Sequence, residues 1–186
     1  RSAAGPWAHQ VAACITPPQS IPAIELLAGT HIVLPKLPLP GMIYAESPVD
    51  NRPVFIMPWK GHTLVGTTER RYQGKPDDIK PSAEEIDYLL KSVAHYFPAQ
   101  AQIREQLEAS FAGCRVLPAN EGSANRKPRE TLLIMDNPKR PRVLSIYGGK
   151  LTAYRATAEQ VMEKLSPIFG KTARTRNTRD IALSTG

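Results

Sequence analysis

Two side chains in the sequence have the types that proton transfer and anion binding require. His31 lies in an apolar stretch between Thr30 and Ile32, where an imidazole is either a hydrogen-bonded core residue or a general base facing a cleft. Arg115 interrupts a second apolar stretch, which we expect to form a mostly buried strand. Burying a guanidinium is costly unless it meets an anion, so Arg115 is expected to pair either with an internal carboxylate or with a ligand. From the sequence, His31 can be either a core residue or a general base, and Arg115 can pair with either an internal carboxylate or a ligand.

A third candidate is the stretch SIYGGKLTAYR at residues 145–155, which places two glycines and a lysine between an expected strand and an expected helix. Glycine lets the backbone approach a ligand closely, and the first N–H groups of a helix carry unpaired positive dipole density. The junction therefore suits an anion. It also fits an ordinary tight turn, which is the commoner use of so short a motif.

The sequence lacks the common motifs for nucleotide binding, for a hydrolase nucleophile and for metal binding. No G-x-G-x-x-G follows an expected strand, and neither a P-loop nor a G-x-S-x-G elbow occurs, so any nucleotide cofactor must have its pyrophosphate held by another segment. Cys14 and Cys114 lack metal-ligand spacing, and no metal site is predicted. Their apolar surroundings predict two buried structural thiols in a reducing compartment.

The elements that must position these residues follow from apolar periodicity. Short segments rich in Val, Ile, Phe and Tyr, separated by Gly, Pro, Asp and Asn, predict antiparallel strands. Ser82 and Glu85 predict a capping box at the start of a helix. The expected strands are residues 29–36, 41–46, 52–59, 62–68, 107–118, 130–136 and 142–148, and the expected helices are 4–15, 82–97 and 150–169. This order predicts an α+β fold, a mostly antiparallel sheet with flanking helices.

Composition sets wider limits on function. The 186 residues, 41% of them hydrophobic, are enough for one sizeable core, and no apolar run has the length of a membrane-crossing helix. The net charge of +7 is compatible with nucleic acid, an anionic membrane surface or an anionic substrate. A basic binding module is therefore the rival from another class, although its basic residues lack interleaved aromatics. The chain begins with Arg1 directly before an expected helix, and we expect it to be a piece of a longer protein.

Six segments, in order along the chain, resemble the FAD-dependent glycerol-3-phosphate dehydrogenase family. Each segment alone is a weak signal, and the six in sequence are a strong one. Two positions depart from the family pattern, because Val116 follows Arg115 where the family commonly has proline, and Glu69 stands where aspartate is more frequent. The segments are AAGPWA at 3–8, GTHIVLPK at 29–36, VFIMPWKGHTLVGTTERRYQGKP at 54–76, PSAEEIDYLL at 81–90, SFAGCR at 110–115 and SIYGGKLTAYR at 145–155.

The resemblance covers the carboxyl-terminal part of that family's catalytic core, without the amino-terminal FAD-binding fingerprint. It implies the substrate-binding domain of an FAD-dependent oxidoreductase together with returning pieces of the FAD-binding domain. The implied divisions are a returning FAD-domain segment at 1–16, the substrate-binding domain at 17–118, the end of that domain with a returning FAD-facing strand and helix at 119–170, and a linker or tail toward a further domain at 171–186.

The resemblance also implies an activity. Family members oxidise sn-glycerol 3-phosphate to dihydroxyacetone phosphate by hydride transfer to flavin, and the electrons pass to quinone. A glycerophosphate oxidase that uses oxygen is the alternative within the same chemistry. The isolated chain is expected neither to hold FAD tightly nor to turn over, because the pyrophosphate fingerprint is missing.

Site residues carry over from the matching motifs. His31 is expected to accept the hydroxyl proton, Arg115 to bind the substrate phosphate and Arg129 to lie near the substrate, while Lys150 lies beside the flavin ring. The helix start after the two glycines is expected to stabilise the negative charge of reduced flavin. The residues expected to bind the cofactor are Gly5, Pro6, Trp7, Gly148, Gly149, Lys150, Leu151 and Thr152.

The expected partners are sn-glycerol 3-phosphate, quinone as electron acceptor and the rest of the parent chain, with no nucleic acid. A peripheral contact with an anionic membrane is compatible with a quinone acceptor, because quinone lies in the bilayer. The expected location is cytoplasmic, on the inner face of the cytoplasmic membrane.

Overall fold

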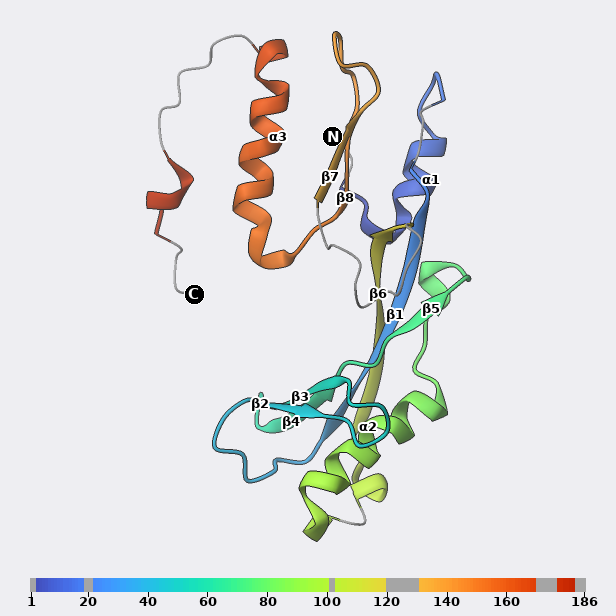
Figure 1. The fold of residues 1–186 in the computed structure, drawn as a ribbon, viewed down its shortest axis with the longest axis vertical. Helices are drawn as coiled ribbons and strands as arrows, with labels where there is room; N and C mark the ends of the chain where they lie inside the picture. The colour runs from blue at the N-terminus through green and yellow to red at the C-terminus, as the bar shows by residue number, and fades with distance from the viewer. Residues whose placement is uncertain (1–2, 19–21, 101–102, 120–130, 170–176, 183–186) are drawn as a thin grey trace. The chain divides into compact units, whose positions relative to one another are not determined.

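The computed structural model describes residues 3–18, 22–100, 103–119, 131–169 and 177–182. It divides into two units, of which the first comprises residues 1–24 and 116–186 and the second residues 25–115. The expected assignment of segments to FAD-binding and substrate-binding domains stays a prediction. The predicted fold class is confirmed, with helices flanking antiparallel strands (Figure 1).

The second unit is built on a six-stranded sheet. Its strands follow the order β2-β3-β4-β1-β5, and β6 pairs with β1 as well. The pairs of β1 with β4, β1 with β5, β2 with β3, and β3 with β4 are antiparallel. The strands are β1 (Ile24–Leu34), β2 (Ile43–Glu46), β3 (Pro53–Trp59), β4 (His62–Gly66), β5 (Arg70–Tyr72) and β6 (Ala109–Pro118).

Helix α2 (Ala83–Tyr96) begins and packs as the sequence predicts. Ser82 and Glu85 form the capping box, each side chain accepting from the other's backbone N–H at 3.2 Å. Leu89, Leu90 and Val93 are buried against the sheet, because positions three and four apart lie on one face of a helix. The strand side of this core is formed by Ile32, Leu34, Val54, Ile56 and Val65.

The hairpin of β3 and β4 also follows from local sequence. Lys60 and Gly61 both have positive φ, 48° and 83°, which is the backbone of a two-residue turn whose twist matches the strands. Trp59 pairs with His62 at its base. This turn sets the register that pairs Phe55 of β3 with Gly66 of β4, and on its other side β4 places the same Gly66 opposite His31 of β1.

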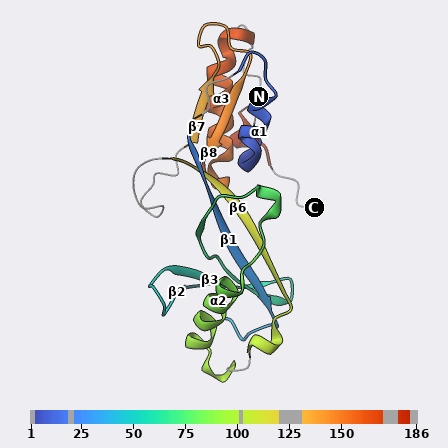
Figure 2. The same ribbon diagram turned by 90° about the vertical axis from the view of Figure 1, so that its right-hand side faces the viewer.

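The first unit holds an antiparallel hairpin and the long helix α3 (Tyr154–Phe169). Leu144 of the hairpin is buried with Val161 and Leu165 of α3, and the helix lies along the hairpin in both views (Figure 2). The hairpin strands are β7 (Thr131–Met135) and β8 (Leu144–Gly148); η1 (Gly5–Trp7), α1 (Ala8–Ala13), η6 (Leu151–Ala153) and η7 (Thr178–Asp180) complete the unit. The second unit adds η2 (Pro76–Asp78), η3 (Pro98–Gln100) and η4 (Ile103–Gln106).

Among the described residues, no helix combines the length and the apolar character needed to cross a bilayer.

Candidate active site

His31 lies on β1, and its ring lies against residues of two of the neighbouring strands, β4 and β6. On β4, Gly66 lies opposite, and a Cβ there would come within 2.7 Å of the imidazole Cγ and 2.8 Å of Nε2. On β6, the Phe111 ring stacks on the imidazole, with centroids 5.2 Å apart and planes 9° from parallel. The absence of a side chain at position 66 therefore provides the space in which the imidazole lies.

The environment of His31 favours its neutral form. Burial lowers its pKa below the ordinary value of 6.5, and the positive charge of Arg115 lowers it further. At neutral pH the ring therefore has a nitrogen lone pair that can accept a proton. The two predicted substrate residues, His31 and Arg115, are thus close enough to interact and belong to one unit.

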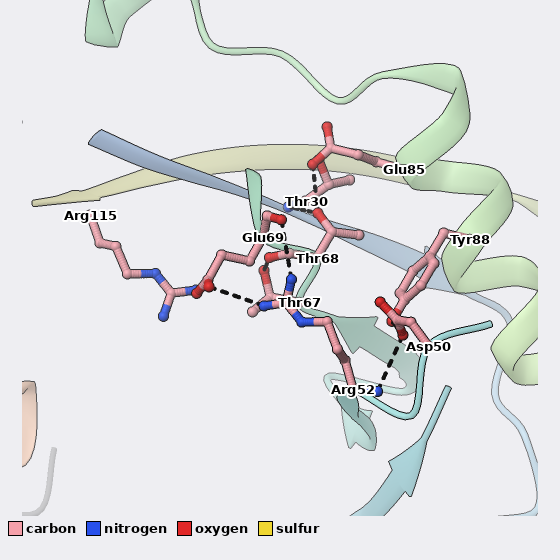
Figure 3. A network of polar contacts seen from close by, with 9 residues as sticks. All are labelled: Thr30, Asp50, Arg52, Thr67, Thr68, Glu69, Glu85, Tyr88 and Arg115. Carbon is pink, nitrogen blue, oxygen red and sulfur yellow. Dashed lines mark hydrogen bonds and ion pairs between the residues drawn. The ribbon is translucent and has the colours of Figure 1, made fainter. Parts of the chain in front are cut away.

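Arg115 belongs to a network of two arginines around one carboxylate (Figure 3). Its terminal nitrogen lies 3.3 Å from Oε2 of Glu69, and a terminal nitrogen of Arg52 lies 3.0 Å from Oε1 of the same group. Arg52 also donates to the backbone carbonyl of Glu69 at 3.3 Å. The Glu69 side chain is only 7% exposed, whereas the two arginine side chains are about one-third exposed. Each arginine therefore combines a buried anchor with a surface that a ligand can reach.

A second carboxylate, Glu85 at the start of α2, lies beside this network. Thr68 donates to it from Oγ1 at 2.6 Å, and Arg70 donates from Nε at 3.1 Å. The same Thr68 oxygen accepts the backbone N–H of Thr30 at 2.9 Å. Burial raises the pKa of Glu85, but these donors and the Ser82 N–H outweigh it, so the pKa is lowered and the group is ionised. The chain of bonds ties α2 to the β1 residue next to His31.

A cavity of about 230 Å³ opens beside both carboxylates. Its walls carry cations, carboxylates and hydroxyl groups that can bind water or a hydroxylated ligand, while apolar atoms form the larger part of the lining. The described lining residues are Asp50, Arg52, Thr67, Thr68, Glu69, Arg70, Glu84, Glu85 and Tyr88. His31 and Arg115 are not among them, so the cavity adjoins the predicted substrate residues through Arg52 and Glu69.

In the first unit, the Gly-Gly-Lys junction has a backbone that requires glycine. Gly148 and Gly149 have φ of 68° and 88°, and a Cβ on Gly149 would lie 2.6 Å from Oγ1 of Thr131. Lys150 is extended and leads into η6 and α3, and the Leu151 side chain is 89% exposed. The predicted cofactor residues Gly5, Pro6 and Trp7 form η1, which contacts β8, the strand that ends at Gly148. Arg129 lies outside the described residues.

Comparison with known proteins decides the family. The family described as FAD dependent oxidoreductase (DAO) matches residues 2–155. The chain belongs to this FAD-dependent oxidoreductase family. The match includes the Gly-Gly-Lys junction, His31 and Arg115.

Relatives in this family add detail. The chain is 38% identical over 172 residues to a protein of Pseudomonas aeruginosa named glycerol-3-phosphate dehydrogenase, covering 90% of this chain and 33% of that protein. It is 33% identical over 168 residues to one of Brucella abortus named D-erythritol 1-phosphate dehydrogenase, covering 89% and 33%. The chain therefore spans about a third of the length of the curated relatives that it matches.

A solved structure shares the fold. The glycerol-3-phosphate dehydrogenase of Bacillus halodurans, complexed with FAD, superposes with a TM-score of 0.74 at 26% identity, over 90% of this chain and 31% of that one. The residues of this chain fit a flavin of the kind that the FAD-dependent family uses. The left-handed Gly148 and Gly149 leave the junction without side chains, and the exposed Leu151 begins the helical turn that follows.

Three charged residues here were not predicted as site residues, namely Arg52 and Glu69 of the network and Glu85 beside it. In the sequence, Glu69 is distinguished only as a departure from a family motif, and Glu85 only as part of a capping box. The available signal was a run of charged residues, Glu69 to Arg71, beside a strand end, where buried carboxylates need cationic partners. Nothing local marked Arg52, which follows a turn.

Two expectations about burial are wrong. Cys14 is exposed and Cys114 is half-buried, so the expected pair of buried thiols is not present. Between Ala109 and Leu117, strand β6 is buried only at Val116 and Leu117, and Phe111 is 46% exposed, so this part of the strand is not mostly buried. Arg115 meets an internal carboxylate, which was one of its two alternatives. Within the described residues, no cluster of three metal-ligating side chains occurs.

Proposed function

We propose that this chain is part of an FAD-dependent dehydrogenase that oxidises the hydroxyl group of a polyol phosphate, and that sn-glycerol 3-phosphate, oxidised to dihydroxyacetone phosphate, is its substrate. The names of the Pseudomonas and Brucella relatives support the substrate class, because both refer to polyol phosphates. The observation that carries the proposal is that the His31 imidazole, fixed between Gly66 of β4 and Phe111 of β6, lies within reach of the positive charge of Arg115. Alcohol oxidation needs a base at the hydroxyl, and a phosphate needs a cation.

In this proposal each side chain has one task. FAD, when bound, supplies the hydride acceptor. His31 accepts the hydroxyl proton at its unprotonated ring nitrogen, which its lowered pKa keeps available at neutral pH. Arg115 binds the phosphate, since one nitrogen faces Glu69 and a guanidinium has further N–H donors. Lys150, Leu151 and Thr152 are proposed to bind beside the flavin ring, and the role of Arg129 near the substrate stays a prediction from the sequence.

Electron transfer to quinone, from a site on the inner face of the cytoplasmic membrane, completes the proposal. Hydrogen peroxide formation by the full-length protein would instead indicate an oxygen-using glycerophosphate oxidase. Steep, salt-dependent binding of the purified chain to DNA would favour the nucleic-acid module, because release of counterions dominates such binding.

The decisive test is Arg115→Ala in the full-length protein. Losing charge-assisted hydrogen bonds worth about 1.5 to 3 kcal/mol should raise KM for sn-glycerol 3-phosphate roughly 10- to 150-fold, with the flavin content unchanged. Arg71→Ala is the matched control, because Arg71 lies on β5 and forms its ion pair with a different carboxylate, Glu25, at 3.8 Å. Equal KM values for wild type and Arg115→Ala would refute the proposed phosphate site.

D-erythritol 1-phosphate is the second candidate substrate, favoured by the Brucella relative. The two compounds share the phosphate and differ in the length of the polyol. Comparing kcat/KM for both on the same preparation distinguishes them, and Arg115→Ala should lower both values because the phosphate is common to both.

A further inference from the structure

Glu69 is placed unusually for a carboxylate. Its side chain is 7% exposed, and its two oxygens face different arginines, Arg52 at 3.0 Å and Arg115 at 3.3 Å. Arg52 is also fixed through the Glu69 backbone carbonyl. A single acidic group thus joins two guanidinium groups from separate parts of the chain, Arg52 just before β3 and Arg115 within β6.

Two guanidinium groups repel each other unless an anion lies between them. Here the carboxylate compensates one of the two positive charges, so the trio keeps a net charge of +1. Long arginine side chains also have many rotamers, and an ordered anchor removes that freedom before a ligand arrives. A buried anion with two half-buried cationic partners therefore preorganises a positive surface.

We infer that Glu69 is a positioning residue that holds Arg115 and Arg52 as a two-arginine site for the substrate phosphate, so that Arg52 is a second phosphate ligand. The inference deepens the proposed function and rests on it, since Arg115 is the phosphate ligand assigned there. The predicted anion is a phosphate monoester, which has three terminal oxygens to receive donors from two guanidinium groups.

The test compares Glu69→Gln, Glu69→Asp and Arg52→Ala in the full-length holoenzyme. Glu69→Gln keeps the size of the side chain and removes its charge, so both arginines lose their anchor. KM for sn-glycerol 3-phosphate and the inhibition constant of inorganic phosphate should rise together, by about tenfold, while kcat changes less than threefold. Arg52→Ala should raise the same two constants. Glu69→Asp keeps the charge and should restore most of the affinity.

Controls separate positioning from folding. Glu25→Gln removes a carboxylate that pairs with Arg71 on the same sheet, and it should leave both constants unchanged. Oxidation of glycerol, which lacks the phosphate, should be equally slow in wild type and Glu69→Gln. A purely structural role would instead lower glycerol oxidation, flavin content and Tm together.

The outcomes are distinct. If Arg115→Ala raises KM but Glu69→Gln leaves it unchanged or lowers it, the positioning role is overturned while the proposed function stands. If Arg115→Ala itself leaves KM unchanged, the phosphate site of the proposed function is refuted, and the positioning role of Glu69 is refuted with it. An unchanged phosphate inhibition constant in Arg52→Ala would remove Arg52 from the site.

Discussion

Gly66→Ala tests whether the place of the His31 ring matters for both folding and activity. The backbone at Gly66 does not have the positive φ that restricts a position to glycine, so alanine would by itself stabilise the protein by about 0.4 to 1 kcal/mol. The new methyl group, however, would lie 2.7 Å from the imidazole Cγ, and ordinary contact begins at 3.4 Å. The ring must therefore move away from its stacked position on Phe111.

The displacement has two costs that outweigh the gain. Overpacking of a strand contact costs about 1 to 3 kcal/mol, and an imidazole forced off its rotamer loses about 0.5 to 1.5 kcal/mol, part of which is the same strain. The expected net loss of stability is about 1 to 2 kcal/mol. Displacement of the His31 base by about 1 Å should also lower kcat on the order of 10²-fold in the full-length enzyme.

Differential scanning calorimetry and steady-state kinetics check the two effects. Gly113→Ala is the matched control, because Gly113 also lies in a strand and a Cβ there meets no atom within 4 Å. Its Tm should be unchanged or slightly raised. If Gly66→Ala has the Tm and the kcat of wild type, then neither the packing argument nor the role of His31 as base is correct.

Three further changes have expected outcomes. Glu85→Ala should destabilise the protein by about 2 to 3 kcal/mol through loss of the helix cap and a buried charge-assisted bond, and Glu84→Ala, its exposed neighbour, should have a much smaller effect on Tm. Because the pKa of Glu85 is lowered from 4.5, its stabilisation is present above that pH and shrinks below it. The pH profile of kcat/KM should rise and level off above a pKa below 6.5, and Arg115→Ala should move that limb to higher pH, because a positive charge beside His31 is lost. Gly149→Ala, at φ 88° and against a threonine hydroxyl, should lower the flavin content of the purified full-length protein severalfold, as read from its absorption spectrum.

Local patterns in the sequence predict those parts of the fold that local forces determine. The capping box at Ser82 and the turn at Lys60 and Gly61 satisfy backbone groups within a few residues, so their signals are complete in the sequence. Strand β5 was missed because three residues, Arg70–Tyr72, have little apolar pattern, and the pairing with β1 determines it. Strand β1 begins five residues earlier than expected, because Glu25 interrupts the apolar pattern there.

Burial in α1 shows why apolar neighbours alone do not predict a buried side chain. Ala8 and Ala12 lie four positions apart and are both buried, so they define the inner face of the helix. Cys14 follows Ala12 by two positions, about 200° around a helix, and therefore faces solvent. The residues around Cys14 are apolar, as expected, but composition does not tell which face of the helix Cys14 lies on.

The same distinction separates the predicted from the missed residues of the active site. His31 and Arg115 were found because each is a polar residue in an apolar strand. Their partners depend on contacts across the sheet, and Glu69 is 46 positions from Arg115 in sequence. A pair of this kind is not identified by spacing, because only tertiary packing determines which carboxylate meets a given arginine.

Two carboxylates within the same cavity wall, Glu69 and Glu85, are nearly buried and each faces at least one arginine. Burying such pairs rarely adds stability over apolar residues of similar volume, because the desolvation penalty offsets the attraction. The position of Glu85 is explained by local contacts, because its carboxylate completes the capping box of α2 and accepts a hydrogen bond from the Thr68 hydroxyl. Glu69 has no such helix to cap, and its contacts hold two arginines from distant parts of the chain. A role in stability therefore accounts for Glu85, whereas the position of Glu69 is better explained by the arginines that it orders for an anion.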